Sequence, residues 1–329
     1  MLLVRNIRLP LSCPDPDAEA AAQALHILRV PAHKAARCGV AKLSVDARHG
    51  KPVLVYTMAI TLKDEGEESA YAGASPCVCF TQPARFSFSV GDTALKTRPV
   101  VVGLGPAGLF AALLLARSGF RPLVLERGPE LDERVKAVEH FEKTGELNLN
   151  ANIQFGEGGA GTFSDGKLTT RVGDPLCAFV TDAFLQHGAP ADIAWRQKPH
   201  VGTDLLRGII RSIRQEIIAL GGEVRFNTAL TGLKIENGAL ASVETTAGDF
   251  ACEQLILAVG HSARDTFAML HQAGVPMEQK PFAVGVRIEH LQREISARQY
   301  GPAWKQLPPS DYKLACHLPT GRSAFTFCV

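Results

Sequence analysis

The feature that most constrains the fold is a glycine motif set between a short apolar run and an apolar helical stretch. The run Pro99–Val102 shows no polar alternation, as in a parallel strand covered on both faces, and residues 103–108 read Gly-Leu-Gly-Pro-Ala-Gly. In such a unit the first glycine makes a tight turn and the second lets the backbone approach a pyrophosphate. The third lets the following helix pack closely on the strand. The motif therefore predicts an α/β fold with a parallel sheet.

The residues after the glycines complete a dinucleotide-binding unit. The apolar stretch Pro106–Ser118 predicts a buried helix with its N-terminus aimed at phosphates, and Gly119 ends that helix. A second apolar strand, Pro122–Leu125, leads to Glu126, which is placed to accept hydrogen bonds from ribose hydroxyls. The adjacent Arg127 would suit a 2′-phosphate, but Glu126 would repel that group. The unit favours FAD or NAD over NADP.

A second glycine-rich segment, Gly156–Gly161, has a similar spacing of glycines, but the residues around it differ. Two further glycines and Pro175 follow it closely, so no helix is expected to open there. We therefore do not interpret it as a second Rossmann turn. A glycine loop without a helix is suited to laying backbone against a flat ring or a diphosphate.

The first 97 residues predict a small N-terminal α+β appendage that ends in a linker. The stretch from Asp64 to Thr97 is rich in Gly, Ser, Pro and charge, as linkers are. The predicted elements are strands over Leu2–Leu9 and Val53–Leu62, a helix over Pro16–Arg29 capped by Asp15 or Asp17, and one candidate strand in the linker at Arg85–Val90.

Residues 98–329 predict the dinucleotide-binding domain, with segments of a substrate domain inserted into it. After the glycine motifs we expect a helix over Asp204–Leu220, closely spaced strands over Glu223–Gly248, and a further apolar strand at Leu255–Gly260.

Charge and composition exclude several classes of protein. The net charge of +2 argues for no general attraction to nucleic acid or membrane. The longest apolar helical stretch, Leu109–Ala116, is too short to span a bilayer, and the first residues lack the apolar core of a secretory signal, so we expect a cytoplasmic protein. Eight cysteines are scattered, and the one-residue gap between Cys77 and Cys79 fits neither zinc nor a CxxC pair. We expect reduced thiols and no metal.

Basic residues in the appendage allow two interpretations. They could form a patch for an acidic partner such as RNA, or a plain solvated face, which is the more common meaning of such spacing. The residues are Arg29, Lys34, Arg37, Lys42, Arg48 and Lys51.

Taken together, these motifs resemble the two-dinucleotide-binding-domain flavoproteins, and within them a bacterial branch of FAD-dependent dehydrogenases. The resemblance spans most of the chain. It rests on residues 100–119, 124–128, 152–168, 198–206, 255–267 and 280–290, and more loosely on 45–57. It implies an α/β fold with a Rossmann-like FAD-binding domain, a parallel sheet, an inserted α+β substrate domain and the small N-terminal α+β appendage.

The resemblance also implies which residues hold the cofactor FAD. The ADP half would lie on Gly103, Gly105, Pro106, Ala107, Gly108, Glu126 and Arg127. The ribityl chain and isoalloxazine would lie along a loop containing Gly158, Gly159, Ala160, Gly161, Thr162, Ser164 and Lys167. Val224 would contact the adenine through its backbone, and Ala258 and Gly260 would bring the chain back over the cofactor.

The length of the chain departs from this family pattern. Members of the branch continue further and carry a later glycine-rich element that closes over the flavin. This chain ends on an apolar, strand-like run over residues 323–329. We therefore expect a C-terminally truncated protein that binds FAD weakly.

The leading hypothesis is an FAD-dependent oxidoreductase that transfers a hydride between the flavin and a small organic substrate, with an unidentified electron donor or acceptor. Candidate catalytic groups are Asp165, Lys167 and His261, although Asp165 also suits a turn and Lys167 a solvated loop. His200 is a further possible proton donor, and Arg264 and Arg287 could bind a carboxylate or pair with Asp265 and Glu289. Two alternatives remain open: an NAD-binding dehydrogenase without flavin, and a non-catalytic cofactor-binding or RNA-associated protein.

Overall fold

The computed structural model describes residues 1–48, 50–82, 86–164, 166, 168, 174–196, 199 and 201–326. The chain divides into two compact units. Unit 1 comprises Met1–Pro83, Trp195–Gln197 and Pro281–Val329, and unit 2 comprises Ala84–Ala194 and Lys198–Lys280. The domain boundary expected after residue 97 stays a prediction.

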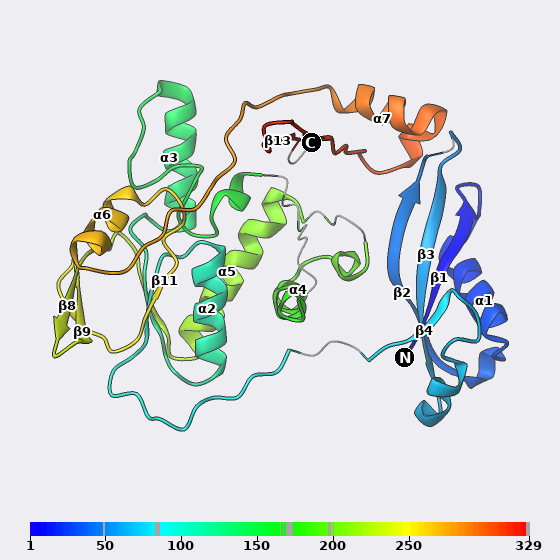
Figure 1. Cartoon of the computed structure of the whole chain (residues 1–329), viewed down its shortest axis with the longest axis horizontal. Helices are drawn as coiled ribbons and strands as arrows, with labels where there is room; N and C mark the ends of the chain where they lie inside the picture. Colours follow the sequence, from blue (N-terminus) through cyan, green and yellow to red (C-terminus); the bar gives the residue numbers. More distant parts are fainter. Residues whose placement is uncertain are drawn as a thin grey trace. The chain divides into compact units, whose positions relative to one another are not determined.

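Unit 1 is built on an antiparallel sheet with one helix on it (Figure 1). The strand order is β2-β3-β1-β4, and the elements in chain order are β1 (Leu2–Pro10), α1 (Pro16–Leu28), η1 (Ala32–Lys34), β2 (Ala35–Asp46), β3 (Val53–Leu62), η2 (Glu65–Tyr71) and β4 (Val78–Phe80). Alternate residues of β3, namely Tyr56, Met58 and Ile60, are buried in one cluster with Ala20 and Ala24 of α1. The two strands and the helix predicted for this segment are confirmed.

The first 97 residues differ from the sequence analysis in two places. The strand β2 was not predicted, because its pairing with β3 shifts register between Ala35 and Arg37 and again between Val40 and Lys42, which breaks the period-two pattern. Conversely, residues 86–90 form no strand, so the candidate strand at Arg85–Val90 is wrong for the part of it that the structure describes.

The remainder of unit 1 contains α7 (Gln292–Tyr300), η5 (Gly301–Gln306) and a hairpin of β12 (Ala315–His317) with β13 (Ser323–Phe325). Residues 281–290 precede α7 in an extended conformation without regular secondary structure. On this segment Phe282, Val284 and Val286 are 86%, 88% and 89% exposed.

Unit 2 is built on a parallel sheet, as predicted. Its strands are β5 (Val100–Val102), β6 (Leu123–Leu125), β7 (Glu223–Arg225) and β11 (Leu255–Leu257), in the order β11-β5-β6-β7. All three pairings are parallel, and Val102 stands beside both Leu125 and Leu257. The carboxyl ends of three strands therefore meet at one edge of the sheet, where α/β proteins bind ligands.

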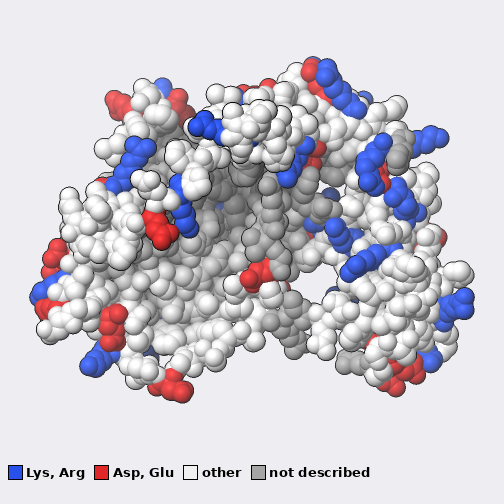
Figure 2. Space-filling view, in the orientation of Figure 1, with Lys and Arg blue, Asp and Glu red and all other residues white. Residues whose placement is uncertain are grey.

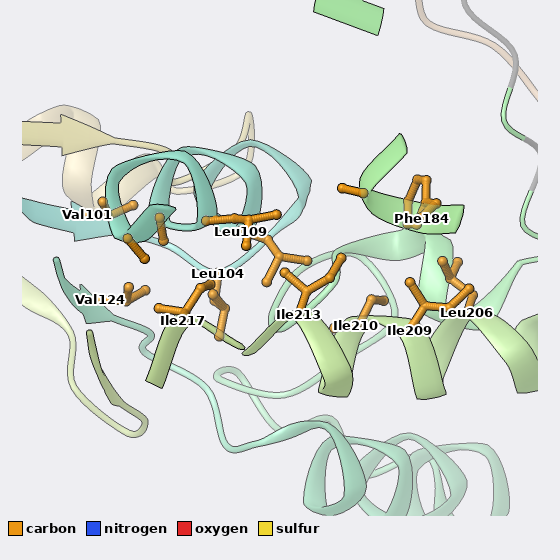
Figure 3. Packing of buried hydrophobic residues seen from close by; sticks show 14 of the residues in the cluster. Val101, Leu104, Leu109, Val124, Phe184, Leu206, Ile209, Ile210, Ile213 and Ile217 are labelled. Atoms are coloured by element: carbon orange, nitrogen blue, oxygen red, sulfur yellow. The ribbon is translucent and has the colours of Figure 1, made fainter. Parts of the chain in front are cut away.

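Both faces of this sheet are covered, which explains the absence of polar alternation in its strands. Val101 and Val124 face one core, shared with α2 (Pro106–Arg117) and α5 (Thr203–Ala219). In Figure 3 the isoleucines of α5, including Ile213 and Ile217, point toward Leu109 of α2.

The other face of the sheet holds a second core. It is formed by Val100, Val102, Leu123 and Leu125, which pack with residues of the antiparallel strands and of α6. These elements are β8 (Leu230–Glu236), β9 (Ala239–Thr245), β10 (Phe250–Ala251) and α6 (Arg264–Gln272).

The remaining helical segments of unit 2 are α3 (Leu131–Thr144), η3 (Ala160–Phe163), α4 (Leu176–Gln186) and η4 (Ala191–Ala194). No α-helix opens directly after Gly161, in agreement with the rejection of a second Rossmann turn. Within the described residues, no helix combines the length and the apolar character needed to cross a bilayer.

Candidate functional site

A cavity of about 690 Å³ lies at the carboxyl edge of the parallel sheet, entirely within unit 2. Its wall combines the turn between β5 and α2, the ends of β6 and β11, the loop around Gly159, the start of β8 and one face of α6. Such a cavity has the size of small-molecule and cofactor sites, and it lies where this class of fold places them.

Most residues predicted for the ADP half of a cofactor line this cavity. The predicted residues in its wall are Gly103, Gly105, Pro106, Ala107, Glu126, Arg127, Gly159, Ala160, Ala258 and Gly260. The structure does not place Gly108, Gly158, Gly161, Thr162, Ser164 or Val224 in the wall. The candidates Asp165, Lys167 and His200 lie outside the described residues.

The three motif glycines occupy different surroundings, which match their predicted roles. Gly103 has a φ of +97°, and a Cβ there would lie 2.4 Å from the Ala258 carbonyl oxygen. At Gly108 a Cβ would lie 1.8 Å from the Gly103 carbonyl oxygen, whereas at Gly105 it would meet no protein atom within 4 Å. The first and third glycines thus permit backbone packing, while the second leaves open space beside the cavity.

The N-terminus of α2 opens on this space. Gly105 is its N-cap residue and Pro106 follows, and no side chain caps the helix. Helix N-termini carry unsatisfied N–H groups and a partial positive charge, so this end can receive a phosphate.

Glu126 is held in a fixed orientation at the end of β6. Its side chain is buried, and its two carboxylate oxygens accept hydrogen bonds from the backbone N–H groups of Leu104 (2.8 Å) and Gly128 (2.9 Å). Each oxygen keeps a further lone pair for a ligand hydroxyl. The carboxylate is therefore held in one orientation in the wall of the cavity.

Arg127 also lines the cavity, and its guanidinium is engaged by an acid from another element. It forms a forked ion pair with Asp265 in the first turn of α6, and the two residues are separated by 138 positions in the chain. This pairing holds the pKa of Asp265 below its usual value. The sequence analysis considered Asp265 only as a partner of Arg264 or Arg287, so its pairing with Arg127 was not predicted.

A buried arginine shapes the glycine loop beside the cavity. Arg134 of α3 is fully buried and donates hydrogen bonds to backbone carbonyls and one hydroxyl, and burial lowers its pKa to about 10. Its acceptors are the carbonyl oxygens of Asn152, Ile153, Glu157 and Gly159 and the hydroxyl of Thr162, at 2.6–3.1 Å. Arg134 thus fixes the loop that passes the N-terminus of α2.

The glycines of this loop allow its close approach to neighbouring elements. A Cβ at Gly156 would lie 2.8 Å from Arg134 Nε, and one at Gly159 would lie 2.6 Å from Pro106 Cδ. All of Gly156, Gly158 and Gly159 have positive φ, which glycine adopts without strain.

Glu157 in the same loop is a buried acid. One of its oxygens accepts a hydrogen bond from the N–H of Leu131 (2.7 Å), and the other lies 2.9 Å from Arg214 Nε, although that N–H is not directed at it. Burial raises the pKa of Glu157, and Arg214 opposes that change. Sequence reasoning missed Arg134, Glu157 and Arg214, since each acts through partners distant in the chain.

One end of the cavity is largely apolar. Leu230 at the start of β8 and Phe267 and Leu270 of α6 line the cavity, together with the hydroxyl-bearing Thr228 and Thr266. An aromatic ring and aliphatic side chains around a slot suit a flat base.

His261, a candidate proton donor, is exposed and is not in the wall of the cavity. Its Nε2 lies 3.3 Å from the hydroxyl of Ser262, which does line it. The structure therefore places no described catalytic candidate directly in the cavity.

The predicted basic residues of unit 1 are partly neutralised. Lys34 lies 3.3 Å from Glu67, and Arg48 pairs with Asp46 at 2.8 Å. Arg37 and Lys42 are exposed on β2, over which Lys and Arg side chains gather in Figure 2.

Comparison with known proteins finds one match to a protein-family model. Residues 281–329 match a family model described as FAD-dependent protein, C-terminal domain-like. Residues 281–329 of the chain are therefore similar to the C-terminal domain of FAD-dependent proteins. The resemblance drawn from the sequence motifs is thereby confirmed, and the match lies at the segment that begins with the motif at 280–290.

A curated relative extends the similarity. An uncharacterized protein of Clostridium beijerinckii is 50% identical over 246 residues, which are 74% of this chain and 46% of that protein. The chain thus spans about half the length of the curated relative it matches.

Solved structures show weaker likeness. THI4 of Thermovibrio ammonificans has a TM-score of 0.36 and 16% identity, over 55% of this chain and 64% of that one. Glycine oxidase of Bacillus cereus has a TM-score of 0.35 and 13% identity, over 55% and 60%. Similarity at these TM-scores is not evidence of a shared function.

Proposed function

We propose that unit 2 binds FAD and that the chain is the cofactor-binding part of an oxidoreductase that transfers a hydride to or from a small organic substrate. The observation that carries this proposal is the joint position of an uncapped helix N-terminus at Gly105 and the buried, oriented carboxylate of Glu126 in one cavity. This combination matches a pyrophosphate and the adjacent ribose of a dinucleotide.

The ADP half would extend along the edge of the sheet. Backbone N–H groups at the start of α2 would bind the pyrophosphate, and Glu126 would accept hydrogen bonds from the ribose hydroxyls. The apolar end beside Phe267 and Leu270 would enclose the adenine and exclude water from it.

The flavin half would continue toward the glycine loop that Arg134 fixes. FAD, when bound, supplies the hydride chemistry, and the protein supplies orientation and electrostatics. The loop from Gly156 to Ala160 offers backbone without side chains, and the Arg134 contacts hold that backbone in place.

Two features favour FAD over the alternatives. The family match is to FAD-dependent proteins, and Glu126 disfavours a 2′-phosphate, which argues against NADP. An NAD-binding dehydrogenase without flavin remains the second candidate, because NAD shares the ADP half that the described residues accommodate.

The proposal is tested by titrating the purified chain with FAD, NAD and ADP in a calorimeter. We expect binding of FAD and ADP, and at least tenfold weaker binding after Gly105→Ala, which puts a methyl group where the pyrophosphate passes. Gly208→Ala on α5 is the matched control, because a Cβ there also meets no atom within 4 Å and Gly208 does not line the cavity. Binding of NAD and ADP but not FAD would favour the second candidate, and binding of none would overturn the proposal.

A further inference from the structure

The cavity contains a cation in the position where a nucleotide with a 2′-phosphate would need one. Arg127 directly follows the ribose-binding Glu126, and both side chains line the cavity. An arginine near the ribose is the group that accommodates a 2′-phosphate in dinucleotide sites of this fold. Taken alone, Arg127 would therefore favour a 2′-phosphorylated ligand and oppose the effect of Glu126.

The structure shows that this arginine already has an anionic partner. Both terminal nitrogens of the Arg127 guanidinium face the carboxylate of Asp265, with Nη1 3.3 Å from Oδ1 and Nη2 closer still to Oδ2. Two parallel contacts of this kind use the geometry with which arginine also binds a phosphate. A phosphate would have to displace Asp265 to obtain the same contacts.

The position of Asp265 keeps that partner in place. It lies in the first turn of α6, where the helix dipole favours a negative charge, and α6 itself forms part of the cavity wall through Thr266 and Phe267. Asp265 is 62% exposed at its side chain, so it is not itself a buried structural group.

We propose that Asp265 determines nucleotide specificity: by occupying Arg127 it denies a counter-charge to a 2′-phosphate, so that the cavity accepts adenosine diphosphate groups with a free 2′-hydroxyl. Glu126 repels the phosphate directly, and Asp265 removes the cation that would offset the repulsion. This inference rests on the proposed function, because it requires that the cavity bind an adenosine diphosphate group.

A purely structural role for the ion pair makes a different prediction. If the ion pair between Arg127 and Asp265 only joined β6 to α6, loss of Asp265 would weaken the binding of all ligands equally and leave their relative affinities unchanged. The ratio of two affinities therefore separates the two roles, since a general loosening of the site cancels from it.

The experiment measures the affinities for ADP-ribose and 2′-phospho-ADP-ribose, which differ only in the phosphate, by calorimetry on the whole chain. In the wild type we expect 2′-phospho-ADP-ribose to bind at least tenfold more weakly. Asp265→Asn should reduce the preference for ADP-ribose over 2′-phospho-ADP-ribose about tenfold. The double variant Asp265→Asn with Arg127→Gln should restore that preference. Asp204→Asn, which changes another exposed acid in the first turn of a helix, should leave the ratio unchanged.

The outcomes distinguish the inference from the proposal beneath it. If ADP-ribose binds but Asp265→Asn leaves the ratio unchanged, the specificity role is wrong and the proposed function stands. If ADP-ribose binds to no variant, including the wild type, the proposed function fails and the inference fails with it. Melting temperatures of each variant establish that the compared proteins are folded, and Asp265→Ser provides a second substitution of the same charge change.

Discussion

At the scale of single residues, the motif glycines differ in what surrounds them. A methyl group at Gly108 would lie 1.8 Å from the carbonyl oxygen of Gly103, whereas one at Gly105 would meet no protein atom within 4 Å. The protein's own packing therefore constrains Gly108, whereas Gly105 borders open space in the cavity.

This difference gives a first prediction. Gly108→Ala forces α2 away from the turn, so we expect a loss of unfolding free energy of about 1–3 kcal/mol or more, as for overpacked cores. Gly105→Ala should cost about 1 kcal/mol or less, because the methyl group meets no protein atom and only a glycine N-cap is lost. Chemical denaturation followed by circular dichroism measures both. Equal losses from the two variants would contradict the assignment of roles.

Arg134 supports a second prediction. Arg134→Met leaves the carbonyls of Ile153 and Glu157 without this donor, so we expect a loss of unfolding free energy of about 1–3 kcal/mol for each acceptor left unpaired. Hydrogen exchange of the amides at 156–162 should also accelerate. The control is Arg211→Met, which removes an exposed ion pair with Asp132 and should cost less than about 1 kcal/mol. Similar behaviour of the two variants would show that Arg134 does not hold the loop.

Sequence could not identify these contacts, because they depend on approach in space. The roles of Gly103 and Glu126 follow from their spacing in a local strand-turn-helix unit. Arg134, in contrast, binds acceptors 18–28 residues away, and Arg127 meets Asp265 across 138 residues. No local pattern marks such partners.

At the scale of elements, a polar cluster joins three helices of unit 2. Glu216 of α5 accepts hydrogen bonds from Arg117 of α2 at 2.8 and 2.9 Å, and lies 2.7 Å from Nε2 of His187 at the end of α4. Hydrogen bonding from Arg117, and then from His187, lowers the pKa of Glu216 below its usual 4.5.

The lowered pKa gives a third prediction. Because the folded-state pKa lies below the unfolded value, Glu216 contributes stability above about pH 4.5, and this contribution is lost as the pH falls through the folded-state pKa. Glu216→Gln should therefore destabilise the protein at pH 7 and much less at pH 3, measured as denaturation midpoints. Glu142→Gln on the exposed surface of α3 should show no such dependence. A constant difference between wild type and Glu216→Gln across this range would contradict the prediction.

Elements with a clear local signal were predictable, and those shaped by partners were not. The alternation in β3, the apolar run of β5 and the spacing of isoleucines in α5 each identify an element from its own residues. The pairing of β2 with β3 shifts register twice. The residues of β2 therefore do not alternate between apolar and polar, and no pattern in its own sequence identifies the strand. The same reason explains why the 3₁₀ segment η2 was taken for linker.

At the scale of the whole chain, unit 1 exposes an apolar ridge. Phe282, Val284 and Val286 lie close together in the segment 281–290, which has no regular secondary structure, and each is more than four-fifths exposed. Extended apolar segments with free backbone groups are templates for association with another chain.

This ridge gives a fourth prediction. Val284→Lys combined with Val286→Lys should reduce concentration-dependent association, measured by light scattering, and leave the melting temperature within about 1 °C, because the side chains bury little area. The control combines Ala283→Lys with Gly285→Lys, which adds the same charge to the same segment but keeps Phe282, Val284 and Val286. An equal effect of both pairs would show that charge rather than the ridge governs association.

The order of strands in the parallel sheet has a consequence for synthesis of the chain. β11 stands beside β5 and delivers Ala258 to the wall of the cavity, yet it is made about 160 residues after β5. At ~5–20 residues per second, a ribosome needs roughly 10–30 s to make that stretch. During this interval β5 and the turn that follows it are already made, but the edge that will hold Ala258 is unpaired. In a nascent chain, this edge of the cavity is therefore complete only after Ala258 and Gly260 have been made.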